Sequence, residues 1–323
     1  MGLSYEFSIG SVRAREKRLF SHADLEQMLS LESESELVRF LKDKGYGEGK
    51  TTDEILESNA ENMWKYLRSI APDMSVFYPF LLQNDIHNLK TILKGLMFDK
   101  SYDGLLLEPC TIDTRELTQA AEHKKFGIFP EPLAKAAGEA YDIIARSKDA
   151  RLGDGIIDRA VLEMLLKEGE KSGSEFLLQY FRTFVFYANI KTALRGARCK
   201  ASMDYFENVL CEWEDFDKRK ITEKAMSGSE VLVKYLEKVT AYDCHKAIKC
   251  YEESAAAFEK FTENKLIRLA REKCRFSNEG AEALFGYYLG CEYERKAVHI
   301  ISGGIKTRTS QDKIRERLRD LYG

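Results

Sequence analysis

The sequence has few prolines, no long apolar run and almost no strand-like pattern. Only 5 of the 323 residues are proline, and segments that alternate apolar and polar residues are almost absent. No apolar run approaches the roughly 18 residues that a membrane-spanning helix needs, and the N-terminal residues lack the apolar region of a signal peptide. We therefore expect a helix-rich protein that does not itself enter a bilayer.

The sequence also lacks a large net charge and a pattern of paired cysteines. Lys and Arg number 50 and Asp and Glu number 53, so the net charge is −3. So small a charge provides no general attraction to nucleic acid or acidic lipid. The 7 cysteines are scattered along the chain, which is typical of reduced thiols in a cytosolic protein. We predict no disulfide framework and no nucleic-acid partner.

Motifs that would indicate catalysis or cofactor binding are missing or incomplete. Residues 45–51 (GYGEGKT) resemble a phosphate-binding loop, but position 44 is Lys where the motif needs Gly. We interpret this segment as a turn between two helices. Cys244, His245 and Cys250 lack the second ligand pair of a structural zinc site. We therefore expect no catalytic residue, no cofactor and no metal.

The most informative pattern is a segment that occurs at three well-separated places. The copies are residues 88–95 (NLKTILKG), 189–196 (NIKTALRG) and, more weakly, 297–304 (AVHIISGG). The third copy keeps the apolar positions and the closing Gly but has neither the Asn nor the two basic residues. In the first two copies polar identities recur as well as apolar ones, which indicates related structural units and not merely similar amphipathic helices.

Helical periodicity surrounds each copy. Apolar residues spaced by three and four predict long helices over 79–98, 174–198 and 279–301, and we expect each to end at the closing Gly of its repeat. Shorter helices are predicted over 22–30, 34–44, 52–70, 131–147, 154–171, 202–213, 228–239, 243–259, 261–274 and 309–320. We interpret Leu105–Leu107 as a buried connector. Breaks near 105 and 212 predict three helical domains, 1–105, 106–212 and 213–323.

The C-terminal segment 306–319 is rich in Lys and Arg. A solvated helix face is the default interpretation, and a docking surface for an acidic protein partner, with Arg315 and Arg319, is the alternative. No aromatic residues lie within this segment as stacking platforms, which disfavours nucleic acid.

In these features the chain resembles the C subunit of the prokaryotic V-type and A-type ATPases, whose eukaryotic counterpart is the d subunit. The order, the spacing and the threefold recurrence of the motifs carry the resemblance. Its residues are Tyr5 with 12–14, Phe80 with 85–95, 188–196, and Tyr287, Glu292, Glu294, Arg295 and Gly304.

The resemblance implies an all-α, funnel-like body of three similar domains around a pseudo-threefold axis. In that family the body caps the membrane rotor ring on its cytoplasmic face and receives the central stalk, so that torque passes between the two motors. It implies a non-catalytic, peripheral protein, present as one copy within a larger complex, with the D- and F-type stalk subunits and the proteolipid ring as partners.

Two other functions stay open at this point, a generic all-helical adaptor and a helical enzyme of an uncharacterised kind. The candidate structural or interface residues are Asp85, Asn88, Lys90, Asn189, Lys191, Arg195, Glu294, Arg295, Arg315 and Arg319.

Overall fold

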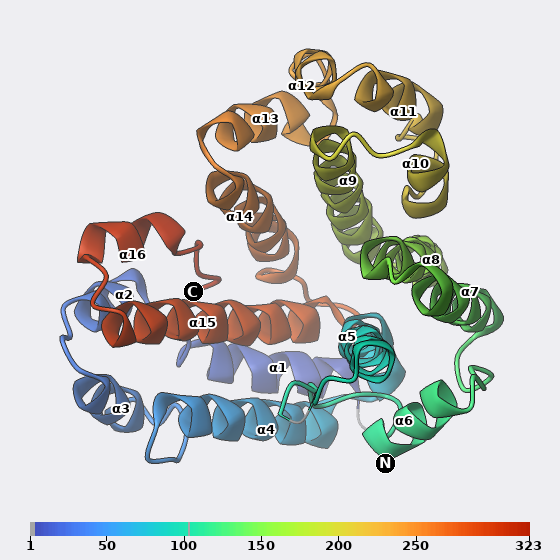
Figure 1. Ribbon diagram of the computed structural model, residues 1–323. Helices are drawn as coiled ribbons and strands as arrows, with labels where there is room; N and C mark the ends of the chain where they lie inside the picture. Colours follow the sequence, from blue (N-terminus) through green and yellow to red (C-terminus); the bar gives the residue numbers. More distant parts are fainter. Residues whose placement is uncertain (1–3, 103) are drawn as a thin grey trace. The chain divides into compact units, whose positions relative to one another are not determined.

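The protein is built from helices joined by short connections (Figure 1). We analysed a computed structural model, which describes residues 4–102 and 104–323. Within these residues the only β-type pairing is an isolated bridge between Trp213 and Phe216. The prediction of an all-α fold is confirmed. In chain order the helices are α1 (Tyr5–Glu16), α2 (His22–Leu29), α3 (Glu34–Asp43), α4 (Thr52–Ile70), α5 (Tyr78–Phe98), α6 (Thr114–Glu122), α7 (Glu131–Ser147), α8 (Ala150–Lys171), α9 (Glu175–Arg198), α10 (Met203–Val209), α11 (Lys218–Met226), α12 (Ser229–Leu236), α13 (Cys244–Glu253), α14 (Ala255–Cys274), α15 (Glu282–Lys306) and α16 (Gln311–Arg317), with 3-10 turns η1 (Met74–Phe77) and η2 (Ala241–Asp243).

Three helices were not predicted, namely α1, α6 and α11. Each buries only a few side chains: α1 buries Ser8, Ile9 and Val12, α6 buries Leu117, Ala120 and Ala121, and most residues of α11 are charged. One predicted break also lies elsewhere, because α14 begins after Ser254, whose side chain accepts a hydrogen bond from the Ala257 N–H. That hydroxyl is a helix N-cap, which satisfies a backbone donor that the helix itself leaves unpaired.

The described chain divides into two compact units. Unit 1 contains the N-terminal part as far as Met74 together with Ala247–Gly323, and unit 2 contains Ser75–Lys246. The division falls within α13. The three domains expected from the repeat stay a prediction.

In unit 1 the long helix α15 is the central element, and α1, α3, α4, α14 and α16 pack on it. Val298 and Ile301 of α15 are completely buried in one apolar cluster with Leu37 and Leu41 of α3. Burying a side chain of this size stabilises the fold by roughly 1.5–3 kcal/mol. The core of unit 1 therefore holds the third copy of the repeat.

In unit 2 the helix α8 is a central element, since α5, α7, α9 and α10 all pack on it. Ile156, Ile157 and Leu165 of α8 are completely buried, and Phe181 of α9 is as well. The helix α9 is buried on most sides, which explains why its sequence is apolar almost all round.

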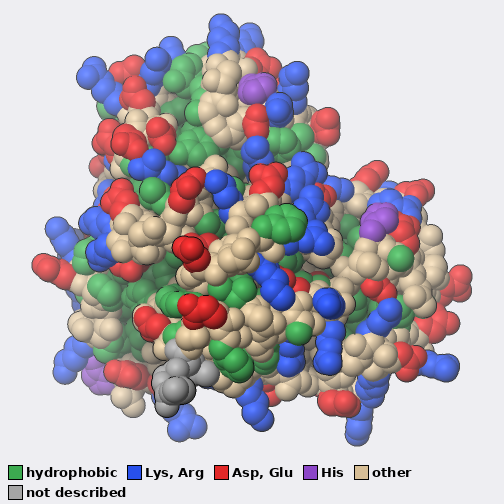
Figure 2. All heavy atoms as spheres, turned by 180° about the vertical axis from the view of Figure 1, so that it is seen from behind, with side chains coloured by type: hydrophobic (Ala, Val, Ile, Leu, Met, Phe, Trp, Pro, Cys, Tyr) green, Lys and Arg blue, Asp and Glu red, His purple; other side chains and the backbone are tan. Residues whose placement is uncertain are grey.

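The surface carries charges of both signs side by side, as Figure 2 shows for one face, in keeping with the small net charge.

Candidate functional site

The two Asn residues of the repeat have the same structural role. The Asn88 side chain donates to the Leu107 carbonyl over 2.9 Å and accepts from the Leu107 N–H over 2.7 Å. The Asn189 side chain binds Cys211 in the same two ways, over 2.6 and 3.1 Å. Each amide thus satisfies both polar groups of one backbone residue. We call this pair of hydrogen bonds the amide clasp. After α5, and again after α9, the chain turns back and runs along that helix to the clasp.

The closing Gly of each repeat lies inside its helix, so the prediction that it ends the helix is wrong. α5, α9 and α15 continue past Gly95, Gly196 and Gly304. A methyl group on Gly196 would lie 2.5 Å from the Phe206 ring, and one on Gly304 would lie 2.5 Å from Cγ1 of Ile314. The Gly is therefore required by the close approach of the returning chain.

The three long helices end in one backbone pattern. The residue four positions after the Gly has a positive φ in each case, 52° at Asp99, 51° at Lys200 and 52° at Arg308. The N–H of the next residue donates to the Gly carbonyl, over 3.0, 2.9 and 2.9 Å respectively. This is the six-to-one hydrogen bond of a Schellman motif, which ends a helix at a left-handed residue. The three ends are thus alike although their αL residues differ and none is Gly.

The third copy retains this helix end but lacks the Asn. Ala297, at the Asn position, is 2% exposed within the apolar cluster of unit 1. The returning chain is held instead by Asn264 of α14, whose side-chain oxygen accepts from the Asp320 N–H over 2.9 Å and whose amide donates to the Asp320 carboxylate over 3.0 Å. Asn264 was not predicted, because it lies outside the repeated segment.

Two of the candidate acids are buried acceptors for backbone N–H groups. Asp85, three residues before Asn88, accepts from the N–H groups of Thr111 and Ile112 over 2.8 and 3.2 Å. Glu294, three residues before Ala297, accepts from the Phe20 N–H. Burial raises the pKa of Asp85, against the effect of its hydrogen bonds, and raises the pKa of Glu294 to about 8. Both acids fasten a neighbouring segment to a long helix.

Lys90, the second polar residue of the first copy, forms an ion pair across unit 2. Its ammonium group lies 2.6 Å from Asp158 of α8, and one turn further along α5 Lys94 lies 3.1 Å from Asp154. Residues four apart on a helix share a face. Two basic residues of α5 therefore match two acids of α8, a complementarity that the sequence contains and that we did not predict.

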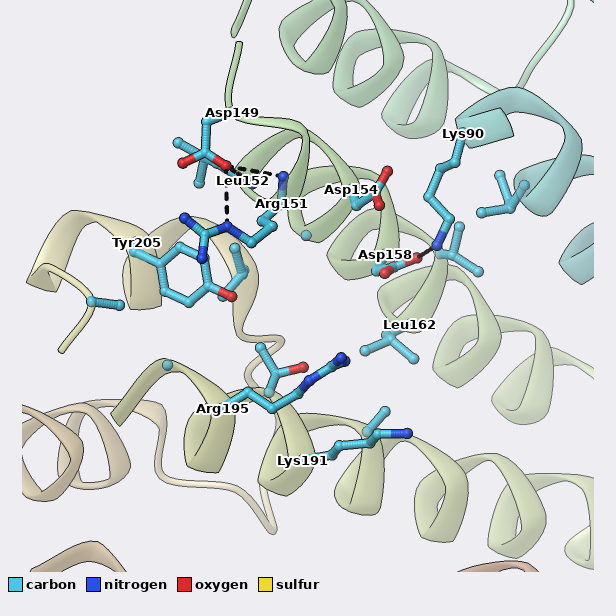
Figure 3. A pocket seen from close by; sticks show the side chains of 18 of the residues that line it. Lys90, Asp149, Arg151, Leu152, Asp154, Asp158, Leu162, Lys191, Arg195 and Tyr205 are labelled. Carbon is cyan, nitrogen blue, oxygen red and sulfur yellow. Dashed lines mark hydrogen bonds and ion pairs between the residues drawn. The ribbon is translucent and has the colours of Figure 1, made fainter. Parts of the chain in front are cut away.

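A groove in unit 2 lies above α8, between α5 and α9, and α10 closes one end (Figure 3). Its volume is about 870 Å³. The helices α5, α8 and α9 each present one face to the groove, since the lining residues on each helix are spaced by three and four. They include Ile86 and Lys90 from α5, Arg151, Asp154, Asp158, Leu162 and Leu165 from α8, Ala188, Lys191 and Arg195 from α9, and Tyr205 from α10. We call this feature the α8 groove.

Comparison with known proteins decides the family. Residues 8–317 match the model that describes the ATP synthase (C/AC39) subunit. The chain belongs to this family. It is similar to the C subunit of the V-type sodium ATPase of Enterococcus hirae, with 20% identity over 317 residues that cover 96% of this chain and 97% of that protein. The C subunit of the A-type ATP synthase of Methanocaldococcus jannaschii is 24% identical over 364 residues, covering 98% and 86%. The resemblance expected from the sequence is confirmed.

Three basic candidates of this C/AC39 chain are engaged in ion pairs within unit 1. Arg315 lies 2.5 Å from Glu26, Arg319 lies 2.6 Å from Glu263, and Arg295 lies 2.8 Å from Glu292. The Arg319 side chain is only 14% exposed. Of the candidate residues, Lys90, Lys191 and Arg195 lie together in the α8 groove, whereas Arg295, Arg315 and Arg319 belong to separate internal pairs.

Two further segments of the C/AC39 chain have a clear outcome. Residues 45–51 form the predicted turn, and Thr51 caps α4 by accepting from the Glu54 N–H. Leu105 and Leu107 are 56% and 42% exposed, so the prediction of a buried connector is wrong. The clasp at Asn88 binds the Leu107 backbone and leaves its side chain outside.

The described residues contain no group of three His, Cys, Asp or Glu side chains that could hold a metal ion. Among the helices of the same residues, none has both the length and the apolar character of a membrane span.

Proposed function

We propose that this chain is a non-catalytic component of a V-type or A-type rotary ATPase, where it links the central stalk to the proteolipid ring and transmits torque between them. The observation that carries the proposal is the family match over residues 8–317, together with relatives that are named as C subunits of such ATPases and that align along most of their length. In this role the chain is peripheral, at the cytoplasmic face of the membrane, and is held there through the ring.

The internal construction suits a part that carries load. The helices α5, α9 and α15 have 21, 24 and 25 residues, which corresponds to lengths of roughly 30–40 Å. Close-packed helices deform little, and each returning chain is fastened by a hydrogen bond from its backbone N–H to an Asn side chain. Torque applied at one end of such a helix passes to its other end with little loss to bending.

The proposed partners are the D- and F-type stalk subunits and the proteolipid ring. The test is to purify the tagged full chain from membranes of its own organism in mild detergent. We expect ATPase, stalk and ring subunits in the sample. In cells without the gene we expect ATP hydrolysis that no longer drives ion transport, and restoration of coupling by the wild-type gene.

A generic helical adaptor gives a different result in the same experiment. It would co-purify with other proteins, and the ATPase would stay coupled in its absence. Either finding would contradict the proposed function.

A further inference from the structure

We infer that the α8 groove binds one helix of a partner subunit, and that this helix is amphipathic and places a carboxylate against Arg195. The inference deepens the proposed function and rests on it only for the statement that the partner is a subunit of the same complex.

The charge of the groove carries the first step. Its acidic lining residues are each held by a donor within unit 2: Asp149 by Arg151, Asp154 by Lys94, Asp158 by Lys90 and Asp204 by Asn208. Arg195, by contrast, is exposed, and its side chain makes no hydrogen bond or ion pair with the described residues. The α9 wall thus presents a positive charge that is not engaged within unit 2, and an acidic ligand would complement it.

The spacing of the two basic residues gives the second step. Lys191 and Arg195 are one helical turn apart, on the face of α9 that lines the groove, and in Figure 3 both extend into the space opposite α8. Neighbours at this spacing are about 6 Å apart. A partner helix that lies along this face therefore passes both basic side chains, and a carboxylate on it can pair with Arg195.

The shape of the groove identifies the ligand as a helix. From Arg151 to Leu165 the floor runs along α8 for roughly 21 Å. Its deeper part is apolar, with Val161, Leu162 and Leu165. An extended peptide laid on such a floor would leave backbone N–H and C=O groups unpaired, whereas a helix satisfies its own. Three helices that each offer one face match the helix-in-groove mode of recognition.

The test places a benzoylphenylalanine photocrosslinker at Ala188, a half-buried residue of the groove, in the full chain within the purified complex. The control carries the same group at Lys135, a residue of α7 outside the groove. We expect a crosslink from position 188 to one subunit, and mass spectrometry should assign it to a segment with an acidic residue next to apolar ones. Position 135 should give no such product.

A charge reversal then tests the chemistry. R195E should lower the yield of the position-188 crosslink about tenfold, and R195K should restore most of it. K167E, which reverses an exposed charge on α8 outside the groove, should leave the yield within about twofold.

Two results would overturn the inference while leaving the proposed function intact. One is a complex that co-purifies normally but gives no protein crosslink at position 188. The other is an R195E variant with an unchanged yield. A sample that contains no ATPase subunit would instead contradict the proposed function, and the proposed partner with it.

Discussion

The end of α9 and the end of α15 solve one structural problem with different residues. After each helix the chain turns at a left-handed residue, packs against a Gly and returns to a buried contact. In unit 2 that contact is made by Asn189 of the long helix itself, whereas in unit 1 it is made by Asn264 of the neighbouring α14. Ala297, where α15 has lost the Asn, joins the apolar core.

The hydrogen bond is thus retained even where the residue that made it is lost. A buried backbone N–H needs a partner, but the partner can come from any element within reach. The weak third copy of the repeat is therefore no sign of a weaker structure. The close approach at the Gly has no such substitute, since only the absence of a side chain provides it, and all three copies keep it.

The largest effect is expected when the clasp itself is removed. Asn189→Ala leaves both polar groups of the buried Cys211 backbone unpaired, which should cost about 3 kcal/mol of local stability. Amide hydrogen exchange should therefore accelerate about a hundredfold in the peptide that contains Cys211. Asn264→Ala should do the same around Asp320, with a smaller effect because one of its two bonds is to a side chain.

The two helix ends would not be equivalent if only one of these variants exchanged its amide hydrogens faster. Unchanged exchange around Asp320 in the Asn264→Ala variant would mean that Asn264 has not taken over the role of the missing Asn.

A second prediction uses two adjacent glycines of α15. Gly304→Ala places a methyl group against Ile314, so unit 1 should lose about 2 kcal/mol. Gly303→Ala meets nothing within 4 Å and should gain up to about 1 kcal/mol, because Ala is the better helix former. Calorimetry should show the two unfolding temperatures move in opposite directions. A shift in the same direction for both would contradict the packing role of the closing Gly.

A third prediction is a dependence on pH. Burial raises the pKa of Glu294 to about 8, so between its ordinary value of 4.5 and about 8 the folded chain binds a proton that the unfolded chain has lost. Stability contributed by this group therefore falls as the pH rises through that window. Glu294→Gln keeps an acceptor for the Phe20 N–H and has no charge to bury.

The Gln variant should thus gain stability relative to the wild-type chain as the pH rises from 5 to 8. Thermal unfolding of both proteins at the two pH values measures the difference. An advantage of equal size at both would show that the Glu294 charge is not what costs stability. Phe186 holds the corresponding position in α9, whereas Asp85 holds it in α5.

The sequence predicted the all-α fold and most helices, because apolar residues that repeat every three or four positions report directly on the buried face of a helix. It predicted that the Asn positions mattered because polar identities recurred. It did not predict what they bind, since Leu107 and Cys211 contribute only backbone atoms to the clasp and every residue has those.

The error at the closing Gly has a related cause. Gly is common at helix ends because it accepts a left-handed conformation, but here Asp99, Lys200 and Arg308 adopt that conformation. The Gly leaves room for the side chain that packs against it, which is Tyr102, Phe206 or Ile314, a different residue in each copy. Likewise the α8 groove joins faces of helices far apart in the chain, and no local pattern marks it.

The amide clasp also determines where this chain tolerates added length. It fixes one backbone residue, Leu107 or Cys211, against a long helix, but it does not fix the number of residues between the closing Gly and that point. Gly95 to Leu107, Gly196 to Cys211 and, with Asn264 in place of the clasp, Gly304 to Asp320 are stretches of unequal length. Related units can therefore acquire insertions of different size at one place while the helices on either side keep their register. The same stretches are the natural positions for an inserted reporter domain, because both of its ends are anchored before the chain re-enters the core.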